Sequence, residues 1–438
     1  MITIEEALER ILSGVSVLPA EAKHSIDALG QVLDEDLRAE FDIPPLANSA
    51  MDGYAVRAGD TAGAHPNCSR SLRVIGEVAA GYVYEGEVAP GEAVRIMTGA
   101  PIPAGADAVV PFEQTDESLG SAHWPPRQAG ELVAVQIFCE ARPGGDVRAA
   151  GEDVRAGDLV LRRGTVLRAA EIGVIASLGR NSVRVIRRPV VAVLSTGDEL
   201  LEPGQPRSGA QIYDANACSV AALVTSFGGI PKMLGIAKDN VEALTASIHE
   251  GLDADMIVTS AGVSRGDFDV VKDVLAREGE IAFFTVAMKP GKPLAFGSFQ
   301  KNGRRIPHIG LPGNPVSSMV AFELFGRPAV LKMMGKTDFR RSVIRAVSEE
   351  RITNCGDPRV FFARCIVTER NGRYYAGLTG AQGSGMLTSM MQANGLTVIP
   401  ADVDVVEAGD EVEVLMLDWS RGEDCGSYLS ESAGGPWK

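Results

Sequence analysis

Apolar runs that end in polar, glycine-rich loops recur four times between residues 190 and 318. Short continuous apolar runs bounded by glycine are typical of strands that are buried on both faces of a parallel sheet. In open α/β sheets, ligands bind just beyond the carboxyl ends of such strands. The pattern therefore predicts a ligand site where four loops meet, in the sequences VVAVLSTGDEL (190–200), MIVTSAGVSRGDFD (256–269), FTVAMKPGKP (284–293) and HIGLPGNPVSS (308–318).

The same region, residues 180–335, alternates strand and helix patterns, which predicts a doubly wound α/β domain with right-handed crossovers. Asp239 and Glu242 form a capping-box-like pair at the start of one predicted helix. Asn314-Pro315 begins another, with proline in the first helical position, and Pro328 should kink or end it.

The flanking regions follow other patterns. Thr3 and Glu6 form a capping box ahead of an amphipathic helix, and a second helix is expected over residues 25–37. Short β runs separated by turns over residues 72–139 predict a small β domain. Beyond residue 335 the pattern returns to β strands, with Asn371-Gly372 as a strong hairpin signal.

These boundaries predict a multi-domain α/β plus β chain with a separate C-terminal tail. A helix is expected over residues 166–179, and it could bring its segment back onto the N-terminal helices. The predicted parts are an N-terminal helical/β domain in two segments (1–41 and 142–179), an inserted β domain (42–141), the α/β domain (180–335), a C-terminal β domain (336–418) and a disordered tail (419–438).

Composition narrows the function classes. The 438 residues carry a formal net charge of −15, which argues against binding to nucleic acid or to anionic membranes, because both rely on excess Lys and Arg. The acidic, amphipathic N-terminus does not resemble a signal peptide, and no apolar run reaches the length of about 18 residues that a membrane helix needs. Six scattered cysteines without a CxxC pair indicate reduced thiols. We therefore expect a cytoplasmic protein.

The four loops carry the chemistry of a phosphate site. In STGDEL, Thr196 and Gly197 are candidate ligand contacts, and Asp198 or Glu199 could be a metal ligand or general base; a turn with a capping Asp is the alternative. In SAGVSRGDFD, glycine lets backbone N–H groups approach an anion and serine adds donors. Its candidates are Ser260, Gly262, Ser264, Gly266 and Asp267, although Asp267 has a simpler interpretation as a helix cap.

The other two loops supply cations and helix-start donors. KPGKP places Lys289 and Lys292 around a turn, where they could neutralise a phosphate or an oxyanion, unless the turn is simply solvated. PGNPVSS places Ser317 in the first turn of a helix, where free N–H groups attract anions. Outside this domain, Asp52, Thr98, Asp153, Arg359 and Ser384 each have an ordinary turn or surface interpretation when taken alone.

Taken together, the motifs resemble those of the molybdopterin molybdotransferase family, whose eukaryotic relatives include the gephyrin E domain. The resemblance runs from about residue 3 to about residue 415, and the joint order and spacing of the motifs make it specific. It is carried by NSAMDGYAV, RIMTGAPIPAGADAVV, GEDVRAGD, STGDEL, IYDAN, SAGVSRGDFD, AMKPGKPLAFG and GLPGNPVSS, in this order.

This resemblance implies a four-domain subunit and a homodimer whose active cleft lies between the α/β domain of one subunit and the N-terminal domains of the other. The implied reaction inserts molybdate into the dithiolene of adenylylated molybdopterin and hydrolyses the adenylate, releasing AMP with the help of Mg²⁺. A molybdopterin adenylyltransferase and recipient molybdoenzymes are the implied partners.

The family's motifs also assign roles to positions of this chain. The implied catalytic residues are Asp52, Thr98, Asp153, Glu199, Asp239, Asp269, Lys289 and Lys292, with Asp239 and Asp269 as the metal ligands. The same motifs place Arg359 and Ser384 in the active site, as substrate contacts. The loops add the candidate substrate contacts Thr196, Gly197, Asp198, Ser260, Gly262, Ser264, Gly266, Asp267, Gly313, Asn314 and Ser317.

The chain departs from the family at Ala261 and Arg265, where a glycine and a small apolar residue are common. Ala261 could narrow the pocket, and Arg265 could add a contact to an anion. Two other functions remain open from the sequence. One is a Mg²⁺-dependent pyrophosphatase or nucleotidyltransferase, although this would not need the N-terminal motifs. The other is a scaffold without catalysis, against which the retained carboxylates and lysines argue.

Overall fold

The computed structural model describes residues 1–118, 133–260 and 269–419, and its contacts divide the chain into two compact units. The first unit consists of Met1–Lys23, Gly30–Asp34 and Arg184–Lys438, and the second of His24–Leu29 and Glu35–Val183. No helix in the described part of the chain is long and apolar enough to span a membrane.

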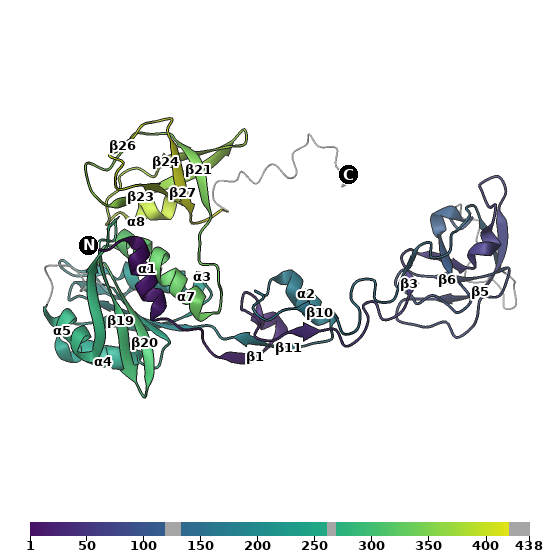
Figure 1. Cartoon of the computed structure of the whole chain (residues 1–438), viewed down its shortest axis with the longest axis horizontal. Helices are drawn as coiled ribbons and strands as arrows, with labels where there is room; N and C mark the ends of the chain where they lie inside the picture. Colours follow the sequence, from purple (N-terminus) through teal and green to yellow (C-terminus); the bar gives the residue numbers. More distant parts are fainter. Residues whose placement is uncertain (119–132, 261–268, 420–438) are drawn as a thin grey trace. The chain divides into compact units, whose positions relative to one another are not determined.

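A six-stranded sheet forms the centre of the first unit (Figure 1). Four neighbouring strands, β15, β12, β16 and β20, pair in parallel. The next strand, β19, is antiparallel to both of its neighbours, β20 and β17. Strand β17 therefore runs in the same direction as β20. The order is β15 (Ile230–Ala237), β12 (Val190–Thr196), β16 (Met256–Ser260), β20 (Arg304–Leu311), β19 (Pro293–Lys301) and β17 (Gly279–Thr285).

The predicted α/β fold is confirmed, but the sheet is mixed rather than wholly parallel. The cause is a tight hairpin between β19 and β20, in which Lys301 pairs with Arg304. Its two turn residues, Asn302 and Gly303, both have positive φ (50° and 76°), as a type I′ turn requires. The reversal affects β19 alone. The loops that follow β12, β16, β17 and β20 consequently all leave the same edge of the sheet.

Helices cover both faces of this sheet, and alternate residues of β12 pack into two separate hydrophobic cores, one on each face. Val191 and Val193 face a core that includes Ala7 of α1, Val220 of α3 and Phe322. Ala192 and Leu194 face the opposite core, built with Leu244 of α4 and Leu275 of α5. The helices are α1 (Ile4–Ser13), α3 (Ala215–Ser226), α4 (Val241–Gly251), α5 (Asp269–Glu278), α6 (Pro315–Ala321) and α7 (Arg327–Met333).

Several local predictions are confirmed. The Thr3–Glu6 capping box closes with reciprocal hydrogen bonds of 3.0 and 3.1 Å. Pro315 opens α6, and a π-helical segment, Phe322–Gly326, separates α6 from α7 just before Pro328. Proline has no N–H to continue the helical ladder, so a locally widened turn is its expected effect.

Two helix predictions are wrong. The segment expected to be helical over residues 25–37 contains only a 3₁₀ turn, Ser25–Ala28, and then β2 (Leu37–Arg38). Gly30 follows this turn with φ 80°, a left-handed conformation that ends a helix. The cap of α4 is also not Asp239: the Asn240 side chain accepts the hydrogen bond from Ala243 N instead.

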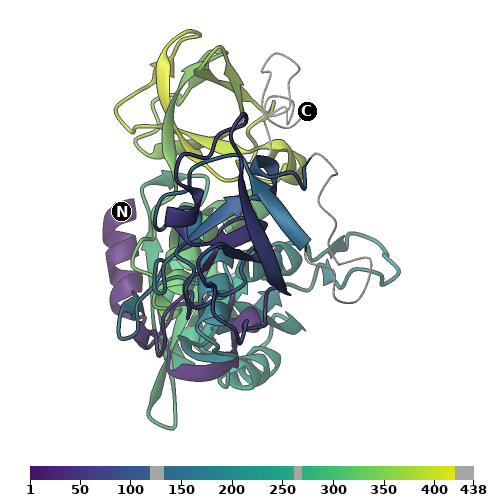
Figure 2. The same ribbon diagram turned by 90° about the vertical axis from the view of Figure 1, so that its right-hand side faces the viewer.

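The C-terminal strands of the first unit close into a barrel, drawn in green to yellow in Figures 1 and 2. The cycle of pairings is β23 (Val360–Arg370), β24 (Arg373–Leu378), β21 (Val343–Ser348), β27 (Glu411–Met416), β25 (Gly395–Ile399) and back to β23. The predicted Asn371-Gly372 hairpin joins β23 to β24. The sequence predicts a disordered tail from residue 419, but the Trp419 ring packs edge-on against Tyr374. Residues 420–438 of the predicted tail lie outside the described residues.

The second unit contains the predicted small β domain and the helix that is predicted over residues 166–179. Its five-stranded sheet has the order β7 (Ala108–Pro111), β4 (Gly53–Val56), β6 (Glu92–Ile96), β5 (Arg70–Val78) and β8 (Val133–Ile137). A short ladder, β3 (Asn48–Ser49) with β9 (Val147–Arg148), and a second one, β2 with β10 (Leu159–Leu161), accompany helix α2 (Ala169–Ser177). The predicted domain boundaries stay predictions.

One buried histidine supports the parallel strands of the α/β sheet. His308 on β20 is 1% exposed, and its Nε2 lies 3.0 Å from Oγ1 of Thr259 on the adjacent β16. The Phe299 ring contacts the imidazole edge-on. Burial lowers the pKa of His308 to about 3, because the apolar surroundings penalise the charged imidazolium.

This histidine should make the protein acid-sensitive. Its folded pKa lies below its ordinary value of about 6.5, so at intermediate pH the unfolded chain binds a proton that the folded chain does not. The stability from this group is therefore present above about pH 6.5 and is lost as the pH falls toward 3. Between pH 7.5 and pH 5 the loss is about 2 kcal/mol.

We predict that His308→Gln reduces this pH dependence, since glutamine does not titrate. Denaturant unfolding at pH 7.5 and pH 5 measures it. The free energy of unfolding of the variant should fall by about 2 kcal/mol less than that of the wild type over this interval. Equal losses in both proteins would contradict the assignment of a neutral, buried His308.

Candidate active site

The loop after β12 presents a carboxylate at the edge of the sheet. Gly197 has φ 146°, and a Cβ at this position would lie 2.5 Å from Oε2 of Glu199. Any other residue would therefore displace that carboxylate. Backbone bonds from Leu200 N to Gly197 O (3.1 Å) and from Ile212 N to Glu199 O (2.8 Å) fix the turn. Thr196 is buried at the end of the strand, whereas Glu199 is exposed.

The neighbouring loop, after β15, meets this one. The backbone N–H of Asp239 donates to Oδ1 of Asp198 across 3.4 Å. Because Asn240 caps helix α4, capping does not explain the presence of Asp239. The structure thus brings together Asp198, Glu199 and Asp239 on adjacent loops of the carboxyl edge.

The loops after β16 and β20 are joined by one side chain. Nδ2 of Asn216, in the first turn of α3, lies 2.8 Å from Oγ of Ser260 and 2.6 Å from the carbonyl oxygen of Gly313. Ser260 ends β16, and Gly313 precedes Asn314 at the start of α6. Two predicted substrate contacts from different loops are therefore held within hydrogen-bond reach of a common amide.

The barrel contributes Ser384 to the same edge. Its carbonyl oxygen accepts a hydrogen bond of 3.0 Å from the backbone N–H of Val316 in α6. Ser317, the next residue, is 5% exposed. The loop that carries Ser384 thus lies against the start of α6, next to Gly313 and Asn314.

A buried arginine that the sequence interpretation did not single out holds this loop. Arg364 on β23 is fully buried, and its guanidinium donates to the carbonyl oxygens of Gln382 (3.1 Å) and Gly383 (3.0 Å) and to Oγ of Ser389 (3.0 Å) in helix α8 (Leu387–Gln392). Burial lowers the pKa of Arg364. The sequence contains one sign of this role. Arg364 interrupts the apolar run VFFARCIV, and a charge that is buried with such a run needs hydrogen-bond partners.

The lysine loop is fixed by the barrel and by the chain start. Strand β18 (Met288–Lys289) pairs in parallel with the start of β23, and Nζ of Lys289 lies 4.6 Å from the centroid of the Phe361 ring. Bonds between Ile2 and the backbone of residues 285 and 287 tie the loop to the N-terminus. Lys292 is exposed.

Arg359 lies one residue before this pairing and is held in place. Its Nε donates to Oδ1 of Asp357 across 2.6 Å, and a second bond makes the pair bidentate. The Arg359 bond, with help from the charge of Lys289, lowers the pKa of Asp357, and the same pair raises the pKa of Arg359. Lys289 and Arg359 therefore both lie close enough to act on the Asp357 carboxylate, which Arg359 pairs directly.

In the second unit, Asp52 and Thr98 form a local pair. Gly53 pairs with Ile96 across strands β4 and β6, which places the two flanking residues at one end of the sheet. Oδ1 of Asp52 accepts from the backbone N–H (2.7 Å) and the hydroxyl (2.8 Å) of Thr98. These two bonds, the backbone one first, lower the pKa of Asp52. Asp153 is exposed in a separate turn, and among the described residues no hydrogen bond or ion pair joins its side chain to this pair.

Some predicted residues lie outside the described part of the chain, namely Gly262, Ser264, Gly266 and Asp267, together with Ala261 and Arg265. Asp269 begins α5, but only its backbone is described. No group of three or more His, Cys, Asp or Glu side chains within the described ranges forms a metal cage. Magnesium usually takes one or two protein carboxylates together with phosphate oxygens and water, so carboxylates on adjacent loops fit it without a cage.

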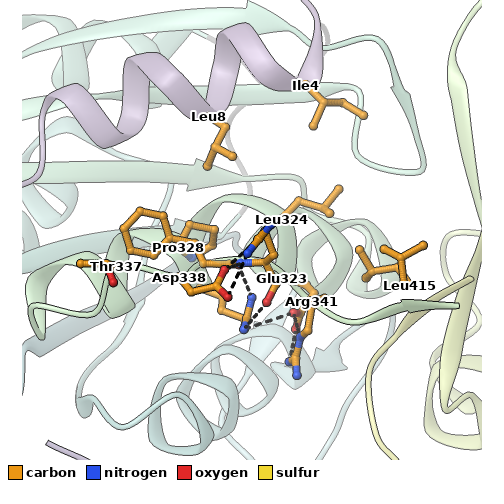
Figure 3. A pocket seen from close by; sticks show the side chains of 13 residues that line it. Ile4, Leu8, Glu323, Leu324, Pro328, Thr337, Asp338, Arg341 and Leu415 are labelled. Carbon is orange, nitrogen blue, oxygen red and sulfur yellow. Dashed lines mark hydrogen bonds and ion pairs between the residues drawn. The ribbon is translucent and has the colours of Figure 1, made fainter. Parts of the chain in front are cut away.

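A separate pocket of about 730 Å³ opens beside α1, the π-helical segment and α7 (Figure 3). Apolar side chains, among them Ile4, Leu8 and Leu324, share its lining with Glu323, whose buried carboxylate pairs with Arg341 across 2.5 Å. None of the predicted site residues lines this pocket. The pocket is therefore not the candidate site at the carboxyl edge.

Comparison with known proteins covers nearly the whole chain. Three family descriptions match in order: "MoeA N-terminal region (domain I and II)" over residues 2–179, "Probable molybdopterin binding domain" over 192–332, and "MoeA C-terminal region (domain IV)" over 345–417. The second of these contains the loops after β12, β15, β16, β17 and β20.

Individual relatives agree. Molybdopterin molybdenumtransferase 2 of Mycobacterium tuberculosis is 39% identical over 394 residues, covering 88% of this chain and 92% of that protein. The molybdopterin molybdenumtransferase of Haemophilus influenzae is 33% identical, covering 94% and 98%. A solved structure of the molybdopterin biosynthesis protein moeA from Pyrococcus horikoshii aligns with a TM-score of 0.75 at 29% identity, covering 95% and 100%.

The order of motifs, the three consecutive family regions and relatives of similar length all agree with the geometry of the carboxyl edge. The chain belongs to the molybdopterin molybdenumtransferase (MoeA) family.

Proposed function

We propose that this protein inserts molybdate into the dithiolene of adenylylated molybdopterin and hydrolyses the adenylate, releasing AMP in the last step of molybdenum cofactor synthesis. The observation that carries the proposal is the convergence of the loops after β12, β15, β16 and β20 on one edge of the α/β sheet, with Ser384 and the lysine loop beside them. Family membership supplies the substrates, and the geometry supplies matching chemistry.

The carboxylates and the cations of the edge have different roles in this proposal. Glu199, exposed and oriented by Gly197, acts as the general base for the water that attacks the adenylate phosphate. Lys289, Lys292, Arg359 and Ser384 bind molybdate, because an oxyanion suits charge-assisted donors. Thr196, Gly197, Asp198, Ser260, Gly313, Asn314 and Ser317 contact the substrate, as do Gly262, Ser264, Gly266 and Asp267 of the undescribed segment.

Magnesium is part of the proposal, with Asp239 and Asp269 as its protein ligands alongside the substrate phosphates. When bound, the cation would neutralise the charge that develops on the phosphates during cleavage. The residues around it orient the substrate and hold the attacking water near Glu199.

The protein is further proposed to act in the cytoplasm as a homodimer. The Asp52–Thr98 pair and Asp153 of one subunit complete the site formed by the α/β domain of the other. The fixed, anionic Asp52 supports this role, because its two bonds to Thr98 hold an exposed carboxylate in one orientation. A molybdopterin adenylyltransferase would supply the substrate, and molybdoenzymes would receive the product.

The direct test combines purified protein with adenylylated molybdopterin, Mg²⁺ and molybdate. AMP release should depend on molybdate. We predict that Glu199→Gln slows turnover by at least about a hundredfold, in the range expected for a lost general base, with unchanged thermal unfolding. Turnover near the wild-type rate would remove Glu199 from the mechanism, and AMP release that ignores molybdate would contradict the proposed reaction.

A second prediction concerns the lysine loop. Lys292→Met should lower kcat/KM for molybdate by about tenfold or more, because an exposed cation that contacts the oxyanion is lost. Lys301→Met is the matched control. Lys301 ends β19, which runs opposite to its neighbours, so it lies at the other edge of the sheet. Steady-state kinetics at varied molybdate measures both, and similar values for the two variants would contradict the role of Lys292.

A further inference from the structure

Asn216 belongs to the IYDAN motif, which none of the roles above uses, and the fold holds its position firmly. It lies in the first turn of α3, whose N-cap is Asp214. Oδ1 of Asp214 accepts from Ala217 N (2.9 Å), and the Asp214 N–H donates to Leu201 O (2.9 Å). Helix α3 therefore starts at a fixed point beside the loop that follows β12.

The hydrogen bonds of Asn216 determine which way its amide faces. The Gly313 carbonyl can only accept a hydrogen bond, so the group 2.6 Å from it must be the amide nitrogen. The second amide hydrogen is directed to Ser260 Oγ, 2.8 Å away. Both donors are thus committed to the protein. Oδ1 of Asn216, on a half-buried side chain, accepts no hydrogen bond from the described residues.

Ser260 completes a pair of groups with opposite polarity. Its Oγ accepts from Asn216, which leaves its hydroxyl hydrogen to donate elsewhere, and within the described ranges it has no acceptor. Ser260 is 1% exposed, so an unused donor at this position is costly unless a ligand satisfies it. Oδ1 of Asn216, an acceptor, and the Ser260 hydroxyl, a donor, therefore lie side by side at the end of β16. The hydrogen bonds of the Asn216 amide hold both in place.

We propose that Asn216 is the residue that recognises the pterin half of molybdopterin. A pterin edge carries N–H donors next to a carbonyl acceptor. Oδ1 of Asn216 accepts one pterin N–H, and the Ser260 hydroxyl donates to the adjacent pterin acceptor. The same amide positions the loops after β16 and β20 around the ring. This assignment rests on the proposed function for its substrate, and residues 192–332, which contain all three groups, match a molybdopterin-binding domain.

The test measures binding without turnover. Molybdopterin and AMP are titrated separately, in the absence of molybdate and under anaerobic conditions, into wild-type protein and Asn216→Ala. Molybdopterin should bind about tenfold more weakly to the variant, the scale of a lost hydrogen bond that leaves its partners unsatisfied. AMP binding should change by less than about twofold. In turnover, KM for adenylylated molybdopterin should rise about tenfold while kcat at saturation stays within about threefold.

Thr225→Ala is the control, because Thr225 is exposed in the last turn of the same helix and bonds only within it. It should match the wild type in both titrations. If Asn216→Ala does not fold, Ser260→Ala removes the proposed donor to the pterin, together with the oxygen that accepts from Asn216. It should still weaken molybdopterin binding by about threefold or more.

Unchanged molybdopterin binding in both site variants would overturn the proposal. Equal weakening of molybdopterin and AMP would show a general disturbance of the edge, and weakening of AMP alone would place adenine against Asn216; either result overturns the assignment to the pterin. If wild-type protein binds molybdopterin with the expected dependence on Asn216 but releases no AMP, the proposed reaction fails while this recognition stands.

Discussion

Strand direction is the constraint on which the rest of the α/β domain depends. Five of the six strands run the same way, and the exception, β19, is reversed by the Asn302-Gly303 hairpin. As a result, the loops after β12, β15, β16, β17 and β20 leave one edge, where parallel sheets bind ligands. A second reversal would move the STGDEL, PGN or lysine loop to the opposite edge. The residue types of each loop are ordinary, and only their arrangement along one edge makes them a candidate site.

Hydrogen bonds then connect the loops into one surface. Asn216 links the ends of β16 and β20, Asp198 meets Asp239, and Ser384 lies against α6. Arg364 connects the barrel to these loops, since its guanidinium donates to the carbonyl oxygens of Gln382 and Gly383. A buried guanidinium is tolerated only where such acceptors surround it. The loop that carries Ser384 is therefore tied by hydrogen bonds to strand β23. Rigid donors of this kind suit oxyanion binding, since they need no reorganisation when the ligand arrives.

Sequence patterns predicted the fold class, the capping box, the Asn371-Gly372 hairpin and the strands whose loops form the candidate site, because these depend on local periodicity and turn chemistry. They missed what depends on distant partners. The Lys-Asn-Gly-Arg turn that reverses β19 is an exception, because Asn-Gly is itself a local hairpin signal. The role of Arg364 was hidden, because nothing local says that carbonyls 18 or 19 residues away will surround it. The N-cap of α4 is Asn240, one residue after the predicted Asp239. Both residue types can cap a helix, so only the observed start of the helix distinguishes them.

In the proposed active site, Asp52 of one subunit acts together with Glu199 of the other, and subunit complementation tests this arrangement most directly. Asp52→Asn and Glu199→Gln proteins, both expected to turn over slowly alone, are unfolded, mixed in equal amounts and refolded together. A shared site predicts that every mixed dimer has one intact and one doubly altered site, so about a quarter of the wild-type rate of molybdate-dependent AMP release returns. If mixed dimers form, as shown by differently tagged subunits, and activity stays at the level of the parent variants, the two residues act within one subunit and the arrangement is contradicted.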